Sequence, residues 1–220
     1  GGNKYSFQGL FDKSVEAIIF EYPGRGKRIK EQLLNDIGLL IEDLYPKVTA
    51  HIGNDTDYYV YGHSLGGIVA YLICKKLMKD PTVRKPEKLI VTGSKPPSLT
   101  VRPFSDLPGE LFWNKLDSLG GMPAAITGEK DLMDFYDPIL RSDVKLFEGY
   151  CHQYGQDISI PIDVFYGSEE EIAAQQIKLW ADETSAEVTI TKLEGNHFFI
   201  LNHADYFRSY FTQLQLDSAT

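Results

Sequence analysis

Apolar and polar residues alternate in blocks along this 220-residue chain. Short, nearly continuous apolar runs are typical of strands buried in a parallel sheet. Such runs occur at residues 17–22, 58–61, 88–92, 162–167 and 187–193. Several of them are separated by stretches in which apolar residues recur at every third or fourth position, as on one face of a helix. Because strands that alternate with helices form parallel β–α–β units, we expect an α/β fold with a mostly parallel central sheet flanked by helices.

The clearest helical pattern lies between the first two predicted strands. Its apolar residues are Leu33, Leu34, Ile37, Leu40, Ile41, Leu44 and Val48. Pro46 falls inside the pattern, and we expect it to kink or interrupt the helix. Further helices are expected at residues 68–73, near 171–181, and at the C-terminal end around Tyr206 and Phe207.

The alternation of strands and helices breaks between residues 103 and 160. This stretch has helical patterns and several prolines, but no convincing strand. An insertion of this length between two strands usually folds over the mouth of the sheet as a lid. The chain shows no internal repeat, and its length is ordinary for one domain. We therefore expect a single α/β domain over residues 1–220, with a helical lid insertion at about 103–160.

One motif at the end of the second predicted strand indicates chemistry. Gly62-His63-Ser64-Leu65-Gly66 follows the strand, and an apolar helical run follows the motif. Gly-X-Ser-X-Gly in this context is typical of a nucleophile elbow, a sharp turn with serine at its tip. Both glycines let the strand and helix approach while the serine takes a strained conformation. We predict Ser64 as a nucleophile, with the Leu65 N–H group directed at an oxyanion.

A serine hydroxyl needs a base to accept its proton, and that base needs an acid to orient it. In hydrolases with this elbow the chain order is serine, acid, histidine. His197 lies in a loop just after a late strand, at the end of the sheet where Ser64 should emerge. We therefore predict His197 as the base. His152 and His203 are the alternatives.

The acid is expected just after the preceding predicted strand. Glu169, Glu170 and Glu171 are consecutive there. Acidic residues also favour the start of a helix because of the helix dipole, so two of the three are expected only to face solvent. The residue pattern leaves the choice among them open.

The composition argues against several other classes of protein. The formal net charge is −9, whereas nucleic-acid binding needs clustered lysine and arginine. No apolar run approaches the length of a membrane span, and no signal-peptide pattern is present. The two cysteines, Cys74 and Cys151, form neither a disulfide framework nor a zinc motif. We expect a reduced, cytoplasmic protein that binds no nucleic acid, membrane or metal ion.

The charge is unevenly distributed along the chain. Residues 1–100 carry 14 basic and 11 acidic side chains, a net of +3, and residues 101–220 carry 8 and 20, a net of −12. One hypothesis is that the basic half receives an acidic partner; the simpler one is a solvated acidic lobe. The basic side chains in question are Lys75, Lys76, Lys79, Arg84, Lys85 and Lys88.

The sequence resembles the type II thioesterases that accompany nonribosomal peptide and polyketide synthetases. The resemblance covers nearly the whole chain and is most specific in two blocks of the lid insertion, since the elbow is shared by many hydrolases. The matching blocks are Gly-Gly at 1–2, Pro-Gly-Arg-Gly at 23–26, the elbow at 62–67, Leu-Gly-Gly-Met-Pro at 119–123, Asp-Pro-Ile-Leu-Arg-Ser-Asp at 137–143 and Gly-Asn-His-Phe-Phe at 195–199.

The resemblance implies an α/β-hydrolase fold and a triad of Ser64, Glu170 and His197. Glu170 stands where the family usually has aspartate, three residues after the glycine that ends the late strand. Because glutamate is one methylene longer, Glu169 and Glu171 remain alternatives.

The resemblance also implies an oxyanion hole, formed by the Leu65 N–H group and an amide near Gly1. The family has a strand before its Gly-Gly block, and the sequence starts at that block. We therefore expect a preceding segment in the native protein.

For function, the resemblance implies hydrolysis of acyl or aminoacyl thioesters on the phosphopantetheine arm of acyl or peptidyl carrier protein domains, which removes wrong or stalled acyl groups. It implies no cofactor beyond the arm that the substrate carries, and we expect a monomer. A small-molecule carboxylesterase with the same triad is the first alternative, because esters and thioesters share the acyl-enzyme route. The second is a non-catalytic module that binds a carrier, which the loss of the family's aspartate favours.

Overall fold

A parallel sheet forms the centre of the protein. The computed structural model describes residues 7–53, 56–99, 103–120, 124–152, 155 and 158–217. Its strands are β1 (Tyr59–His63), β2 (Lys88–Thr92), β3 (Ile162–Gly167) and β4 (Val188–Leu193). They lie side by side in this order, each parallel to the next. The fold class expected from the alternating pattern is confirmed.

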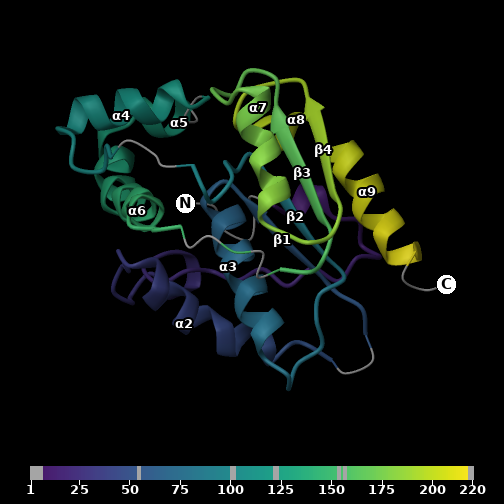
Figure 1. Cartoon of the computed structure of the whole chain (residues 1–220). Coiled ribbons are helices and arrows are strands. Elements are labelled where there is room, and N and C mark those ends of the chain that lie inside the picture. The colour runs from purple at the N-terminus through teal and green to yellow at the C-terminus, as the bar shows by residue number, and fades with distance from the viewer. Residues whose placement is uncertain are drawn as a thin grey trace.

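Helices cover both faces of the sheet because neighbouring strand residues point to opposite sides. Leu89 and Val91 of β2 pack in one core cluster with Trp180, together with residues of α3 (Leu65–Lys79). Ile90, between them, packs on the other face with residues of α8 (Phe199–Asn202) and α9 (Ala204–Asp217). Figure 1 shows α3 and α9 on opposite sides of the strands.

The shorter elements join these layers. Between β3 and β4 the chain forms α7 (Ala174–Ile177) and the 3₁₀ helix η3 (Lys178–Asp182), where sequence analysis expected a single helix. The Trp180 side chain of η3 is fully buried, and its Nε1–H donates to the Ser94 carbonyl oxygen at 3.1 Å. Two further 3₁₀ helices, η1 (Gln8–Leu10) and η2 (Gly26–Arg28), lie before the sheet.

The predicted helix after residue 33 is present but starts later. Helix α2 spans Ile37–Thr49, and the Asp36 side chain caps it by accepting from the Leu39 N–H at 2.9 Å. An aspartate cap of this kind satisfies one of the unpaired N–H groups of a first turn. Pro46 lies within α2 and does not interrupt it, since the helix continues to Thr49.

The prediction of a strand at residues 17–22 is wrong. The stretch is irregular, and no described strand pairs with it. A run of apolar residues becomes a strand only where a neighbouring strand supplies its hydrogen bonds. Instead, residues 17–20 and strand β1 line parts of one large cavity, and β1 is the end strand of the described sheet.

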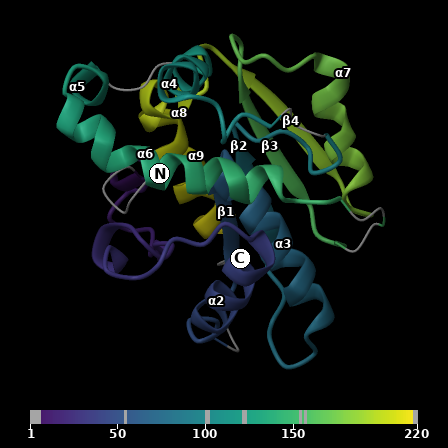
Figure 2. The ribbon, with the colours of Figure 1, turned by 90° about the vertical axis from the view of Figure 1, so that its left-hand side faces the viewer.

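The lid insertion is helical, as expected. Its helices are α4 (Gly109–Ser118), α5 (Ala124–Thr127) and α6 (Lys130–Glu148). Figure 1 shows them gathered at one end of the molecule, and the turned view of Figure 2 shows α6 crossing the near side. Within α6, Arg141 donates to the carbonyl oxygens of Ser105 and Leu107, so the helix is tied to the loop before α4.

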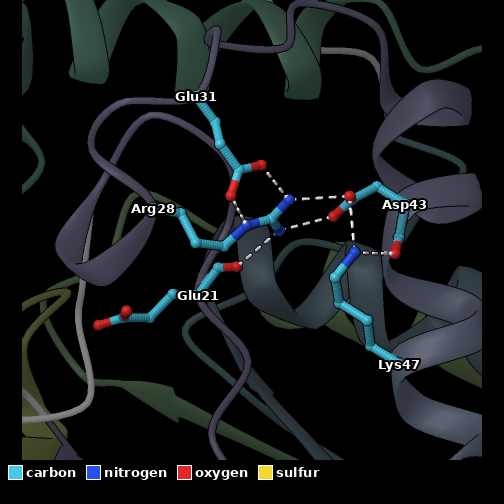
Figure 3. A network of polar contacts seen from close by, with 5 residues as sticks. All are labelled: Glu21, Arg28, Glu31, Asp43 and Lys47. Carbon is cyan, nitrogen blue, oxygen red and sulfur yellow. Dashed lines mark hydrogen bonds and ion pairs between the residues drawn. The ribbon is translucent and has the colours of Figure 1, made fainter.

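A charged network fastens the turn after residue 22 to α2. The Arg28 guanidinium lies between the carboxylates of Glu31 and Asp43, and Lys47 reaches the second of these (Figure 3). The same guanidinium donates to the Glu21 carbonyl oxygen at 3.0 Å. These two carboxylates raise the pKa of Arg28 above its ordinary value, and two-sided contacts suit the planar guanidinium fork.

Both cysteines are free thiols. Cys74 is buried in α3 and Cys151 is exposed. Burial raises the pKa of the Cys74 thiol, which makes it unreactive. Over the described part of the chain, no helix is both long and apolar enough to cross a bilayer.

Candidate active site

Ser64 sits at the tip of a strained turn between β1 and α3. Its backbone has φ 56° and ψ −124°, which makes it the one non-glycine residue with positive φ in the described chain. A Cβ on Gly62 would lie 2.0 Å from the Gly66 carbonyl oxygen, so only glycine fits before the turn. Gly66 itself has room, because its Cβ would meet nothing closer than 3.9 Å. Of the two elbow glycines, only Gly62 is required by close approach.

The turn places Ser64 at the start of a helix. Leu65 is the first residue of α3, so its N–H group has no acceptor within the helix and is available to an oxyanion. The Ser64 N–H donates to the Thr92 carbonyl oxygen at 2.9 Å, which ties the turn to the end of β2. Gly1, the second predicted oxyanion residue, lies outside the described residues.

Three predicted side chains meet in one hydrogen-bonded chain. Ser64 Oγ lies 2.9 Å from His197 Nε2, and His197 Nδ1 lies 2.7 Å from Glu170 Oε1. The other carboxylate oxygen, Glu170 Oε2, accepts from the Gly167 N–H at 2.8 Å. Backbone and imidazole therefore hold the carboxylate from two sides, and the imidazole links it to the hydroxyl in the order that nucleophilic catalysis requires.

The alternative residues lie elsewhere. His152 Nε2 is 3.7 Å from the Glu183 carboxylate, and His203 Nε2 contacts the Glu194 carbonyl oxygen at 2.8 Å. The side chains of Glu169 and Glu171 are exposed, and Glu171 comes within 3.9 Å of the Lys115 ammonium group. Among the three glutamates, Glu170 is the one that contacts His197.

A second imidazole, His63, lies beside the first. The rings of His63 and His197 are 5.0 Å apart between centroids, and His63 Nδ1 lies 3.0 Å from Thr92 Oγ1. The Tyr61 hydroxyl lies 3.0 Å from the same Thr92 oxygen. Burial lowers the pKa of His63 well below its ordinary value of 6.5, and His197 lowers it further. His63 thus packs against the site as a neutral ring, which agrees with the packing position it has in the elbow motif.

We expect His63 to make folding stability depend on pH. Its pKa is lower in the folded than in the unfolded state, so the unfolded state gains a proton first and stability falls as pH drops below about 6.5. A single group contributes a slope of at most about 1.4 kcal/mol per pH unit. His63→Gln should show a shallower decline between pH 6.5 and 5, measured by urea unfolding. Equal slopes in both proteins would contradict the neutral ring.

A cavity of about 1710 Å³ opens beside these residues. Ser64, His63 and His197 line it together with apolar side chains of the lid insertion. The apolar lining residues from the insertion are Phe104, Leu116, Leu119, Leu140, Val144 and Phe147. An apolar cavity next to a polar triad is typical of a site for a small or extended ligand.

Sequence analysis missed one buried ion pair in the wall of this cavity. Arg25 donates to the Asp143 carboxylate, and both residues are almost fully buried. They come from two of the sequence blocks that carry the family resemblance, but nothing in one sequence shows that distant blocks touch. The pair joins α6 to the turn after residue 22. In the described ranges no group of three or more histidine, cysteine, aspartate or glutamate side chains is placed to hold a metal ion.

Comparisons with known proteins find thioesterases among the most similar sequences and structures. The Thioesterase PikA5 of Streptomyces venezuelae is 29% identical over 89% of this chain and 70% of its own length. The Gramicidin S biosynthesis protein GrsT of Aneurinibacillus migulanus is 25% identical over 89% of this chain and 77% of its own length. The solved structure of YbtT, a type II thioesterase from the yersiniabactin NRPS/PKS pathway, is 27% identical, with a TM-score of 0.78 over 97% of this chain and 87% of that one.

A family-wide comparison covers almost the full length. The sequence profile of the Thioesterase domain matches residues 5–213. That range includes the elbow, all three glutamates after β3 and the loop that carries His197. It also spans the lid insertion between β2 and β3. The chain therefore belongs to the thioesterase domain family.

Proposed function

We propose that the protein is a serine hydrolase that cleaves acyl thioesters carried on the phosphopantetheine arm of carrier protein domains. The observation that supports this most directly is the hydrogen-bonded chain from Ser64 through His197 to Glu170, inside a thioesterase fold. The relatives support the setting, since PikA5 is named a thioesterase and YbtT a type II thioesterase of an NRPS/PKS pathway. The role of such an enzyme is to release wrong or stalled acyl groups during peptide or polyketide synthesis.

In the proposed mechanism, His197 Nε2 takes the hydroxyl proton of Ser64 while Ser64 Oγ attacks the thioester carbonyl carbon. The Leu65 N–H group, with a second amide, holds the oxyanion that forms. The carbon–sulfur bond then breaks, and the pantetheine sulfur leaves with the proton from His197. Glu170 keeps the imidazole in the tautomer that accepts at Nε2 and stabilises the imidazolium.

The second half of the reaction releases the acid. His197 removes a proton from water, and the resulting hydroxide attacks the acyl group on Ser64. The ester bond to Ser64 breaks, and the serine oxygen takes the proton back from the imidazolium. The apolar lid side chains are suited to the acyl chain, because a cavity lined by them excludes water from the hydrocarbon.

The basic residues suggested as a carrier-docking surface are partly occupied within the protein itself. Lys76 pairs with Glu42 at 2.5 Å, and Lys88 pairs with Asp163 at 2.9 Å. Lys85 donates to the carbonyl oxygen of Leu77, which lies in the last turn of α3. Surface charges with internal partners offer less to an acidic partner. Carrier binding therefore remains part of the proposal, and this patch is not its main support.

One comparison of substrates tests the proposed function. The same acetyl group is offered as an acetyl-phosphopantetheinyl carrier protein and as p-nitrophenyl acetate, and kcat/KM is measured for both. We expect the carrier-bound thioester to be preferred. A preference for the free ester would indicate the carboxylesterase alternative. Tight binding of the carrier without turnover of either substrate would indicate a non-catalytic module.

A further inference from the structure

Three basic side chains line the catalytic cavity, and two of them have an acidic partner. Arg25 is paired with Asp143, and Lys115 lies 3.9 Å from the Glu171 carboxylate. For the third, Lys95, no hydrogen bond or ion pair joins its ammonium group to any described residue. A negatively charged ligand in the cavity would give this ammonium group a counter-charge.

The backbone that carries Lys95 is rigid and buried. Pro96 and Pro97 follow it and are both buried, and a residue before proline is restricted to extended conformations. On the other side, the Gly93 N–H donates to the Phe165 carbonyl oxygen at 2.9 Å, and the Ser94 carbonyl accepts from Trp180. Lys95 itself is partly exposed, although the residues on both sides of it are buried, and it lies on the wall of the cavity.

This segment starts next to the catalytic imidazole. A Cβ built on Gly93 would lie 3.3 Å from His197 Cε1 and 2.8 Å from His63 Cε1. Two residues of chain span at most about 7 Å, so the Cα of Lys95 is close to the ring, and its four-carbon stem has further reach. Lys95 therefore lines the cavity two residues along the chain from a glycine that borders the catalytic imidazole.

We propose that Lys95 binds an anionic group of the thioester substrate and so determines its specificity. This rests on the proposed function of the site. The chemistry is that of a carboxylate or phosphate held by a charge-assisted hydrogen bond. Two parts of the substrate carry such a group: an acyl chain that ends in a carboxylate, and the phosphate of the pantetheine arm. The proximity of Gly93 to His197 favours the acyl chain.

Four thioesters distinguish a carboxylate on the acyl chain from the phosphate of the pantetheine arm. Glutaryl and 5-methylhexanoyl groups have the same shape, with the carboxylate of the first replaced by an isopropyl group in the second. Each is attached to pantetheine and to 4′-phosphopantetheine, and kcat/KM is measured for the wild type, Lys95→Gln and Lys95→Arg. Lys192→Gln, at an exposed lysine of β4 outside the cavity, is the matched control. Thermal unfolding of each variant checks that it is folded.

We expect Lys95→Gln to lower kcat/KM for both glutaryl thioesters by roughly 10- to 100-fold, the range for a hydrogen bond to a charged group, and to spare the 5-methylhexanoyl thioesters. Lys95→Arg should retain most of the glutaryl activity. A loss confined to the two phosphorylated substrates would instead identify the phosphate as the anion. The proposal would be overturned if Lys95→Gln had the kcat/KM of the wild type on all four thioesters, or if its kcat/KM fell by the same factor on all four.

A binding measurement tests the inference separately from turnover, so that the inference is also decided if the protein hydrolyses none of these thioesters. Glutarate and inorganic phosphate are each titrated into the folded proteins, with the uncharged diamide glutaramide as the control for glutarate, and the shift in Tm is recorded. At least one of the two anions should raise the Tm of the wild type and of Lys95→Arg, but not that of Lys95→Gln. The same shift in all three proteins, or none in any, would overturn anion binding by Lys95.

Discussion

Replacing Ser64 with alanine is expected to lower kcat for thioester hydrolysis by roughly four to six orders of magnitude. Losses of this size follow removal of the serine from a triad, because the remaining groups have no nucleophile to act through. The variant should fold, since alanine and serine meet the same strain at φ 56° and the Ser64 N–H bond to Thr92 is kept. Single-turnover kinetics with an acyl-carrier substrate, read by mass spectrometry, would measure the loss and show the missing acyl-serine.

A serine outside the active site is the control for the loss of kcat expected in Ser64→Ala. Ser159 is exposed, and its hydroxyl donates a long hydrogen bond to Met78 Sδ at 3.7 Å. Ser159→Ala should keep wild-type kcat and form the acyl-enzyme at the usual rate. Retention of activity in Ser64→Ala beyond about one hundredth of wild type would contradict the role of Ser64 as nucleophile.

Replacing Glu170 with glutamine is expected to lower kcat by about 10⁴-fold, as when the acid of a triad becomes an amide. The structure gives a specific reason. The Gly167 N–H needs an acceptor at the position of Oε2, so the amide oxygen of glutamine takes that place and its NH₂ group faces His197 Nδ1. The imidazole must then carry its proton on Nε2, where it no longer accepts from Ser64 Oγ.

The neighbouring glutamates are the controls for this prediction. Glu169→Gln and Glu171→Gln change exposed side chains by the same isosteric step, and each should alter kcat less than about threefold. The pH–rate profiles of all three variants would be measured on one substrate. Small, equal effects at the three positions would remove the assignment of the acid to Glu170.

The strands and the elbow were predictable because their signals are local. Residues 88–92 and 162–167 were expected as strands from their apolar runs, and β2 and β3 have these bounds. The strain at Ser64 follows from a five-residue motif, and His197 was identified because it comes just after a late predicted strand. Local pattern and family resemblance together named the three side chains that the structure brings together.

What could not be predicted depends on contacts between distant segments. Residues 17–22 have the composition of a strand, but a strand also requires a partner, and composition does not supply one. The Arg25–Asp143 pair depends in the same way on how the turn after residue 22 meets α6, and the place of Lys95 on the cavity wall depends on which segments surround the loop after β2. The choice among three consecutive glutamates required a side-chain direction, which spacing alone does not give.

The position of strand β1 links the edge of the sheet to the nucleophile. It leads directly into the nucleophile, and it is the end strand of the described sheet, with a largely apolar cavity lined in part by its own residues. An end strand is a template on which a further strand docks. A strand paired along that edge would restrain the backbone of β1 as far as His63, the residue before Ser64, and so the catalytic turn itself.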